Sequence, residues 1–322
     1  MSALESILYK IIVIALVPFV PLNVSDVFHV FESGQGNGQI VYQTSITRQS
    51  EVFEGPHKTD VFSLGVVTSA GSALVIDEAS SAVLFEKDAD TPRSIGSITK
   101  LMTALVFLDS ETSFNATAQI LQEDIRYGGV QYVLPNDPVR VQDLFSASLI
   151  GSDNTSSAAL MRLSGLGERD FIGRMNQKAK ELGMTQSTFV DATGLSSHNR
   201  ASARDVSKLI QEATKTPKLQ EVISKSEAVF VGQSGYTYNI PSTDELLQTF
   251  LNKPPYKVIG AKTGYLPEAG YCLSVRVTKN GSSDLLLVVL GSESKVARFD
   301  DVKALSSWAY KTFSWETDPS NL

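Results

Sequence analysis

Three apolar segments in the C-terminal third of the chain constrain its fold most strongly. They read "KVIGAKTG", "YCLSVRVTKN" and "DLLLVVLGS" and cover residues 257–264, 271–280 and 284–292. Their β-branched and aliphatic residues, interrupted by short turns, are typical of consecutive strands. The third segment is apolar from residue 285 to residue 290, as expected for a strand that is covered on both faces. The sequence therefore predicts a sheet with both faces buried.

The chain before these strands carries a hairpin and then a block of helices. "SALVIDEASSAVLFEKD" (residues 72–88) has two β-rich runs around "DEASS", which indicates a hairpin. A capping box of Ser202 and Asp205 marks the start of one helix. Further helices are predicted over residues 97–108, 141–150, 155–163, 168–182 and 295–313. This order indicates an α/β sheet domain with a helical subdomain inserted in its middle.

The N-terminal region differs from the rest of the chain in its sequence pattern. Residues 7–22 read "ILYKIIVIALVPFVPL", with Lys10 before an apolar run. This pattern fits a signal peptide or a retained membrane anchor over residues 1–24. The polar "ESGQGNGQ" that follows indicates a flexible linker over residues 25–60. We expect a folded domain over 61–315, a tail over 316–322, and an exported, extracytoplasmic protein; if residues 1–24 are retained, they hold it at the membrane.

Charge and composition exclude several classes of partner. The 322 residues carry a net charge of −7, whereas nucleic-acid binding needs a basic surface. The three histidines lie far apart without ligand spacing, so we expect no metal and no cofactor. Cys272 is the single cysteine and lies in an apolar run, which favours a buried, inert thiol.

A serine and a lysine stand together at the start of one predicted helix. In "SIGSITKLMTAL", Ser97 and Lys100 are three residues apart, so both side chains fall on one helix face. A serine hydroxyl is a weak nucleophile unless a base takes its proton. A lysine has a pKa of about 10.4, so acting as a base near pH 7 needs differential stabilisation of about 4 kcal/mol. Burial and a nearby second cation would each lower this pKa. The lysine is therefore expected to be buried.

Two further motifs follow in a fixed order. "GSDN" contains Ser152 and Asn154 between two predicted helices, and "AKTG" places Lys262 on a predicted strand. The Ser-x-x-Lys and Ser-x-Asn patterns each recur elsewhere in the chain, whereas Lys-Thr-Gly occurs once. Each motif alone is a weak indication of function, because short patterns occur by chance. The three motifs in this order, each in its own structural context, are a specific indication.

This ordered set resembles that of the penicillin-recognising serine enzymes. The stretches "SAVLFEKDADTPRSIGSITKLMTAL", "FVDATGLSSHNRASARDVSKLI" and "IGAKTGYLPEAGYCLSV" are similar to the D-alanyl-D-alanine carboxypeptidases, over about residues 62–313. The resemblance implies a β-lactamase/transpeptidase-like fold, with an antiparallel sheet flanked by helices. It also implies removal of the terminal D-Ala from peptidoglycan stem peptides and covalent binding of β-lactam antibiotics.

The resemblance assigns a role to each motif residue. Ser97 would be the acylated nucleophile and Lys100 its general base. Ser152 would relay a proton to the leaving amine, and Lys262 would polarise Ser152. Asn154 would orient Lys100 or the substrate amide.

The Lys-Thr-Gly segment would bind the substrate. The resemblance implies that Lys262 and Thr263 hold the substrate carboxylate, and that the N–H groups of Ser97 and Tyr265 form an oxyanion hole. Gly264 has a physical rationale of its own, because a glycine on an exposed strand lets a peptide pair alongside as an added strand.

The sequence departs from the family pattern in two places, and each motif residue has a structural alternative. Ile95-Gly96 stands where the family usually has Pro-Ala, and residues 265–268, "YLPE", stand where small polar residues are common. Lys100 could be a surface lysine and Lys262 an edge-strand charge. The serines and Asn154 could be caps or loop residues. In "DATGL", Asp191 is interpreted as a turn residue only.

Three other functions remain open at this level. A D,D-endopeptidase that cuts cross-links would use the same groups, because only the width of the cleft differs. A class A-like β-lactamase would need a Glu-x-x-x-Asn loop, and none occurs between Ser152 and Lys262. A wall-binding protein without activity would be expected to lack at least one of the motif groups.

Overall fold

The computed structural model describes residues 55–315, and its centre is a five-stranded sheet with the strand order β10-β11-β12-β2-β3. Every neighbouring pair in this sheet is antiparallel. The strands are β2 (Ser72–Asp77), β3 (Val83–Lys87), β10 (Tyr256–Leu266), β11 (Gly270–Lys279) and β12 (Ser283–Ser292). The predicted hairpin and the three predicted C-terminal strands are thus confirmed. Strand β10 lies at one edge of the sheet.

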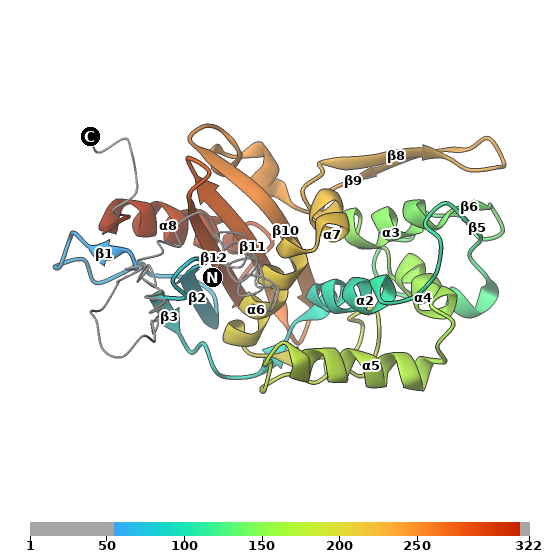
Figure 1. Cartoon of the computed structure of the whole chain (residues 1–322), viewed down its shortest axis with the longest axis horizontal. Helices are drawn as coiled ribbons and strands as arrows, with labels where there is room; N and C mark the ends of the chain where they lie inside the picture. Colours follow the sequence, from blue (N-terminus) through green and yellow to red (C-terminus); the bar gives the residue numbers. More distant parts are fainter. Residues whose placement is uncertain (1–54, 316–322) are drawn as a thin grey trace, which may run out of the picture. The chain divides into compact units, whose positions relative to one another are not determined.

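Strand β12 shows why its sequence is apolar on both faces. Its residues alternate between two hydrophobic cores: Leu286 and Val288 belong to one, and Leu287 and Val289 to the other. Helix α6 (Ala203–Lys215) contributes to the first core and α8 (Ala297–Thr312) to the second. The sheet therefore lies between these helices, as Figure 1 shows.

The predicted helical block is also present. Its members are α2 (Thr99–Leu108), α3 (Val141–Ile150), α4 (Asn154–Leu163) and α5 (Glu168–Glu181). These four helices gather beside one end of the sheet (Figure 1). A further helix, α7 (Pro217–Ile223), was not predicted, although Pro217 occupies the first helical position that proline favours.

Several short elements complete the described part of the chain. Two-residue ladders join β1 (His57–Lys58) to β13 (Phe313–Ser314), β4 (Arg93–Ser94) to β7 (Arg200–Ala201), and β5 (Thr117–Ala118) to β6 (Val139–Arg140). The longer hairpin consists of β8 (Glu227–Val231) and β9 (Thr237–Pro241). The 3-10 helices are η1 (Gly96–Ile98), η2 (Gln122–Asp124), η3 (Glu245–Gln248) and η4 (Phe250–Asn252). No helix within residues 55–315 has the length and apolar character needed to cross a bilayer.

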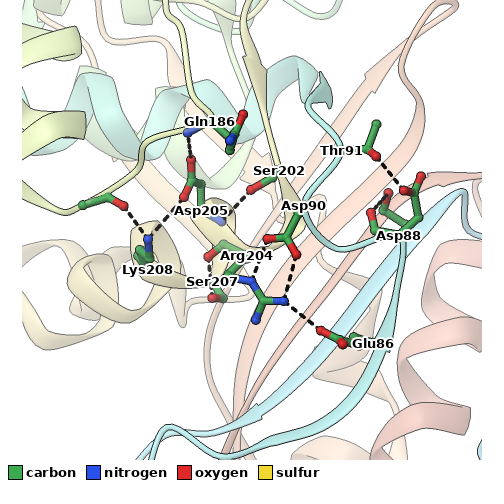
Figure 2. A network of polar contacts seen from close by, with 12 residues as sticks. Glu86, Asp88, Asp90, Thr91, Gln186, Ser202, Arg204, Asp205, Ser207 and Lys208 are labelled. Atoms are coloured by element: carbon green, nitrogen blue, oxygen red, sulfur yellow. Dashed lines mark hydrogen bonds and ion pairs between the residues drawn. The ribbon is translucent and has the colours of Figure 1, made fainter.

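The start of α6 connects the helix to neighbouring segments. Ser202 caps the helix by accepting a hydrogen bond from the N–H of Asp205, as predicted. The Asp205 carboxylate turns away from the cap and accepts from the N–H of Gln186 instead (Figure 2). Arg204 reaches the opposite way and pairs with Glu86 and Asp90, each at 2.7 Å (Figure 2). The first turn of α6 thus holds the segment after α5 and the segment around β3.

Three sequence expectations fall mainly or wholly outside the described residues. The signal peptide or membrane anchor over residues 1–24 and the tail over 316–322 lie entirely outside them, as do residues 25–54 of the expected linker. The last residues of that linker, from 55 to 60, are described, and His57–Lys58 pair there with Phe313–Ser314.

Candidate active site

Ser97 lies in a tight turn that directly precedes helix α2. The predicted helix was expected to begin at Ser97, but residues 96–98 form the 3-10 helix η1 and the α-helix begins at Thr99. Gly96 has a φ of 51°, in the left-handed region that favours glycine. A Cβ at this position would lie 2.7 Å from the backbone nitrogen of Tyr265. The turn therefore brings the backbone before Ser97 against strand β10.

Lys100 lies one turn beyond Ser97 and is fully buried. Its Nζ lies within hydrogen-bond distance of three oxygens: Ser97 Oγ at 3.0 Å, Asn154 Oδ1 at 2.6 Å and the Thr193 carbonyl at 2.5 Å. These contacts exclude the surface-lysine alternative. They also join residues that are up to 96 positions apart in the sequence, from Ser97 to Thr193.

Burial lowers the pKa of Lys100 from its ordinary value to about 7, because the charged amine is removed from water. The carboxylates of Asp153 and Asp191 act in the opposite sense and raise this pKa. The sequence predicted that a second cation would assist the depression. Burial is the cause that lowers the Lys100 pKa, and the nearby cation is Lys262, whose own pKa is lowered by its repulsion with Lys100.

The loop between α3 and α4 carries Ser152 and Asn154. Ser152 has a φ of 62°, a left-handed conformation that is uncommon for a residue other than glycine. Buried Asp153 fixes this loop by accepting hydrogen bonds from the N–H groups of Ser156 and Tyr132. The Asn154 side chain spans two segments, since its Oδ1 accepts from Lys100 and its Nδ2 donates to the Gly128 carbonyl at 2.7 Å.

Lys262 approaches Ser152 from strand β10. Its Nζ donates to Ser152 Oγ at 3.0 Å, and the side chain is only 1% exposed, which excludes the edge-charge alternative. Burial holds the pKa of Lys262 well below its ordinary value, and the positive charges of Lys100 and Arg298 lower it further. The two lysines are therefore electrostatically coupled, and each meets one serine hydroxyl.

Glycine is required at position 264 for a different physical reason from the one expected. The prediction was that this glycine leaves room for a peptide along an exposed strand. A Cβ at Gly264 would lie 2.2 Å from the carbonyl oxygen of Ile95, and Gly264 is buried. The glycine is thus required for the contact between β10 and the segment leading to Ser97. Gly194 fits against the same segment, because a Cβ there would lie 2.2 Å from the Gly96 carbonyl oxygen.

Tyr265 follows the motif and lies at the rim of the site. Its side chain is 48% exposed and stacks on Tyr271 of β11, with ring centroids 4.4 Å apart. Its backbone nitrogen lies beside Gly96, as described above. The N–H groups of Ser97 and Tyr265 therefore come from adjacent backbone segments.

Sequence reasoning missed four groups around these side chains. Asp191 does form a turn, as interpreted, but its Oδ1 also accepts from the N–H of Thr193, whose carbonyl meets Lys100. The Thr243 hydroxyl accepts a hydrogen bond from the Thr263 hydroxyl at 2.7 Å. Arg298 of α8 donates to the Gly264 carbonyl at 3.2 Å, and burial lowers its pKa.

Apart from the stretch around Asp191, no sequence motif indicated these partners. Thr193 and Gly128 take part through backbone carbonyls, which every residue type carries. The "DATGL" stretch around Asp191 was the one available signal.

The arrangement defines a serine-lysine centre, and comparison with known proteins identifies its family. Residues 62–294 match the family model of peptidase family S11, described as D-alanyl-D-alanine carboxypeptidase. The chain belongs to this family of serine peptidases.

Named relatives include two activities. A D-alanyl-D-alanine endopeptidase of Pseudomonas aeruginosa is 34% identical over 243 residues, covering 74% of this chain and 77% of the relative. A D-alanyl-D-alanine carboxypeptidase of Bacillus subtilis is 27% identical over 256 residues, covering 78% and 64%.

Solved structures share the fold. The Streptomyces K15 DD-transpeptidase has a TM-score of 0.71 at 26% identity, covering 77% of this chain and all of that one. Penicillin-binding protein D2 of Listeria monocytogenes, in a cefotaxime-bound form, has a TM-score of 0.66 at 28% identity. The chain therefore has the β-lactamase/transpeptidase fold predicted from its sequence.

Proposed function

We propose that this protein is a D,D-peptidase of peptidoglycan that acts through an acyl-enzyme on Ser97. The observation that carries the proposal is the environment of the Lys100 amine. A neutral lysine amine has two N–H donors and one lone pair. The carbonyl of Thr193 and Oδ1 of Asn154 are acceptors only, so they take the two N–H groups. The lone pair is then left for the Ser97 hydroxyl at 3.0 Å.

The first step would transfer the acyl group of the substrate to the enzyme. Lys100 takes the proton of Ser97 while Oγ bonds to the carbonyl carbon of the scissile amide. The N–H groups of Ser97 and Tyr265 stabilise the negative charge on the carbonyl oxygen; one such donor is typically worth about 10²- to 10³-fold in rate. The C–N bond then breaks, and the leaving amine receives a proton through Ser152.

Lys262 and Thr263 would bind a substrate carboxylate on the leaving-amine side of the scissile amide. Lys262 contacts Ser152 directly, so one amine serves both carboxylate binding and the proton relay. The buried guanidinium of Arg298, bonded to the Gly264 carbonyl, adds positive charge behind the same strand. A substrate carboxylate near this cluster would be stabilised because the surrounding protein excludes water.

Between the two D,D-peptidase activities, we favour the endopeptidase. This replaces the carboxypeptidase that the sequence favoured. Three relatives named D-alanyl-D-alanine endopeptidase are 32–35% identical, whereas those named carboxypeptidase are 26–30% identical. The carboxypeptidase remains the second candidate, because the family model carries that description. A cross-linked muropeptide and a pentapeptide ending in D-Ala-D-Ala, assayed side by side, distinguish the two by their kcat/KM.

Benzylpenicillin tests the catalytic centre itself. We expect one covalent adduct on Ser97, detected by intact mass and peptide mapping, and no adduct with Ser97→Ala or Lys100→Met. Lys295→Met is a matched control, since Lys295 follows Ser292 at the same spacing but its side chain is 62% exposed. A folded wild-type protein without an adduct would exclude the proposed centre. Rapid release of hydrolysed penicillin would instead indicate a β-lactamase.

The place of action follows from the same proposal. Peptidoglycan lies outside the cytoplasmic membrane, so the enzyme would have to be exported. Residues 1–24 are the proposed signal peptide or membrane anchor. N-terminal sequencing of the protein from its native host would show whether this segment is removed, and fractionation would show whether the protein stays with the membrane.

A further inference from the structure

A buried carboxylate near the candidate active site has no role in the chemistry proposed above. Asp244 directly precedes the 3-10 helix η3 and is only 5% exposed. Its Oδ1 accepts a hydrogen bond from the N–H of Leu246 at 3.0 Å and so caps η3. Its Oδ2 is buried and has no hydrogen-bond partner among residues 55–315. A serine or an asparagine would cap η3 without burying a charge, so the cap alone does not explain this carboxylate.

The segment that carries Asp244 is fixed to two parts of the active site through the residue before it. Thr243 Oγ1 lies 2.7 Å from Thr263 Oγ1 of strand β10. The N–H of Thr243 donates to the carbonyl of Ile150 at 3.1 Å. Ile150 ends helix α3 and precedes the loop that carries Ser152. Asp244 is therefore held beside both the substrate-binding strand and the serine loop.

Three buried cations of the site have no carboxylate partner. Lys100, Lys262 and Arg298 are each at most 5% exposed. Within residues 55–315, none of them forms an ion pair, and Arg298 Nε, like Asp244 Oδ2, has no hydrogen-bond partner. Burial, Lys100 and Arg298 all lower the pKa of Lys262. The protonated form of Lys262 is thus opposed by its burial and by two like charges.

Asp244 acts on these cations in the opposite sense. Its negative charge raises the pKa of Lys262 and that of Arg298. Burial raises the pKa of Asp244 itself to about 6, while Arg298 and Lys262 lower it and the neighbouring Glu245 raises it. Glu245 is exposed and pairs with Lys295 at 2.7 Å. Asp244 is therefore mainly ionised at neutral pH and offsets the charge of the buried cations.

Lys262 needs its proton in order to bind an anion. An ammonium forms a strong, charge-assisted hydrogen bond to a carboxylate, and a nearby opposite charge favours the protonated amine. We propose that Asp244 is a positioning residue whose negative charge keeps the Lys262 amine protonated, so that this amine can bind the substrate carboxylate. This inference rests on the proposed D,D-peptidase function and deepens it.

Benzylpenicillin and its methyl ester test the proposal, because the ester lacks the carboxylate that Lys262 would bind. The ratio of their second-order rate constants for acylation is measured with the full chain from pH 5 to 10. We expect wild-type protein to react faster with the free acid. This preference should disappear at alkaline pH, where Lys262 loses its proton. The ratio compares two compounds in one protein, so the titration of Lys100 and general losses of activity cancel.

Two variants remove the charge of Asp244 and keep a cap for η3. Asp244→Asn has a side chain of the same size, and Asp244→Ser introduces another residue that caps helices. Without the anion the pKa of Lys262 falls, so the preference for the free acid should disappear about one pH unit lower than in wild-type protein. Below about pH 6 the wild-type carboxyl is itself protonated, and the ratios of the three proteins should converge.

Glu245→Gln is the matched control, because it removes an equal charge one residue away from an exposed, ion-paired side chain. This variant should keep the wild-type pH dependence. The wild-type dependence in a folded Asp244 variant, or an equal shift in Glu245→Gln, would overturn the proposal. A wild-type protein that reacts equally with acid and ester at every pH would also overturn it. Failure of wild-type protein to react with benzylpenicillin at all would instead overturn the proposed function.

Discussion

At the scale of single residues, the amine of Lys100 is fully buried and still makes three close contacts to oxygen atoms. Burial lowers its pKa to about 7. The base form is therefore abundant near neutral pH, while the contacts with Thr193 and Asn154 keep the amine in place.

This pKa predicts the pH dependence of acylation. A lysine whose pKa is lowered to about 7 loses its proton as the pH rises through 7, so the reactive form increases with pH. We expect the rate constant for acylation by benzylpenicillin to be about tenfold lower at pH 6 than on its plateau above pH 8. Stopped-flow measurement from pH 5 to 10 checks this. An inflection near pH 10, where an ordinary lysine titrates, would show that the pKa of Lys100 is not lowered.

Thr243 supports the substrate-binding strand through a single hydrogen bond. Its Oγ1 lies 2.7 Å from Thr263 Oγ1. When Thr263 donates its one proton to the substrate carboxylate, the Thr243 hydroxyl is placed to donate to Thr263 and hold it in position. We expect Thr243→Val to lower kcat/KM about fivefold, since a neutral hydrogen bond contributes about 1 kcal/mol.

Thr278→Val is the matched control for Thr243. Thr278 is buried in β11 and its hydroxyl has no hydrogen-bond partner among the described residues. This variant should retain wild-type kinetics. An equal loss in both variants would mean that the effect comes from packing rather than from the hydroxyl pair.

The sequence was sufficient to nominate the polar side chains of the centre. Ser97, Lys100, Ser152, Asn154 and Lys262 have distinctive residue types at fixed spacings, and the structure brings them together. The backbone acceptors around them could not be predicted, because a carbonyl has no residue-type signature. Arg298 reaches the centre from the last helix, through a contact that no spacing in the sequence predicts.

At the scale of elements, the contact between β10 and the segment before Ser97 decides whether the site can form. Gly264 contributes no side chain to this contact, and the Ile95 carbonyl occupies the space that a Cβ would need. We expect Gly264→Ala to separate the two segments, which would lower the melting temperature and abolish reaction with benzylpenicillin. Differential scanning calorimetry and intact mass measure the two effects.

Gly173→Ala is the corresponding control in helix α5. A Cβ at Gly173 would meet no atom within 4 Å, and this residue lies inside a helix. The substitution should raise stability by about 0.5–1 kcal/mol, because alanine favours the helical conformation. A destabilising Gly173→Ala, or a neutral Gly264→Ala, would contradict this explanation of where glycine is required.

Long elements were predicted well and short ones were not. The helices and the five sheet strands have enough residues for a periodic pattern, and their predicted bounds differ from the observed ones by a few residues. The two-residue ladders, such as β4–β7, have no period and arise from tertiary contacts alone. Hairpin β8–β9 was missed even though "GQSG" separates two alternating runs there.

At the scale of the whole molecule, the described ends of the chain meet the sheet through specific hydrogen bonds. Trp315 Nε1 donates to Asp77 Oδ1 at 2.7 Å, and Asp77 is only 1% exposed. Trp315→Phe would leave this buried oxygen without its donor. We expect a loss of about 1–3 kcal/mol in the free energy of unfolding, measured by urea denaturation.

A second tryptophan provides the comparison. Trp308 Nε1 donates to Ser63 Oγ at 2.7 Å, but Ser63 is partly exposed, so water can replace the lost donor. Trp308→Phe should therefore cost less than Trp315→Phe. Equal losses would indicate that the size of the ring, rather than the hydrogen bond, determines both values.

The single cysteine is a natural probe for transient unfolding of the protein in solution. Cys272 is fully buried in β11, as predicted, and burial raises the pKa of its thiol to about 11. Its Sγ lies 3.9 Å from the carbonyl oxygen of Ser94, which is three residues before Ser97. A thiol-alkylating dye should label the native protein only as fast as the sheet opens. The labelling rate therefore measures the rate of transient unfolding around the catalytic core.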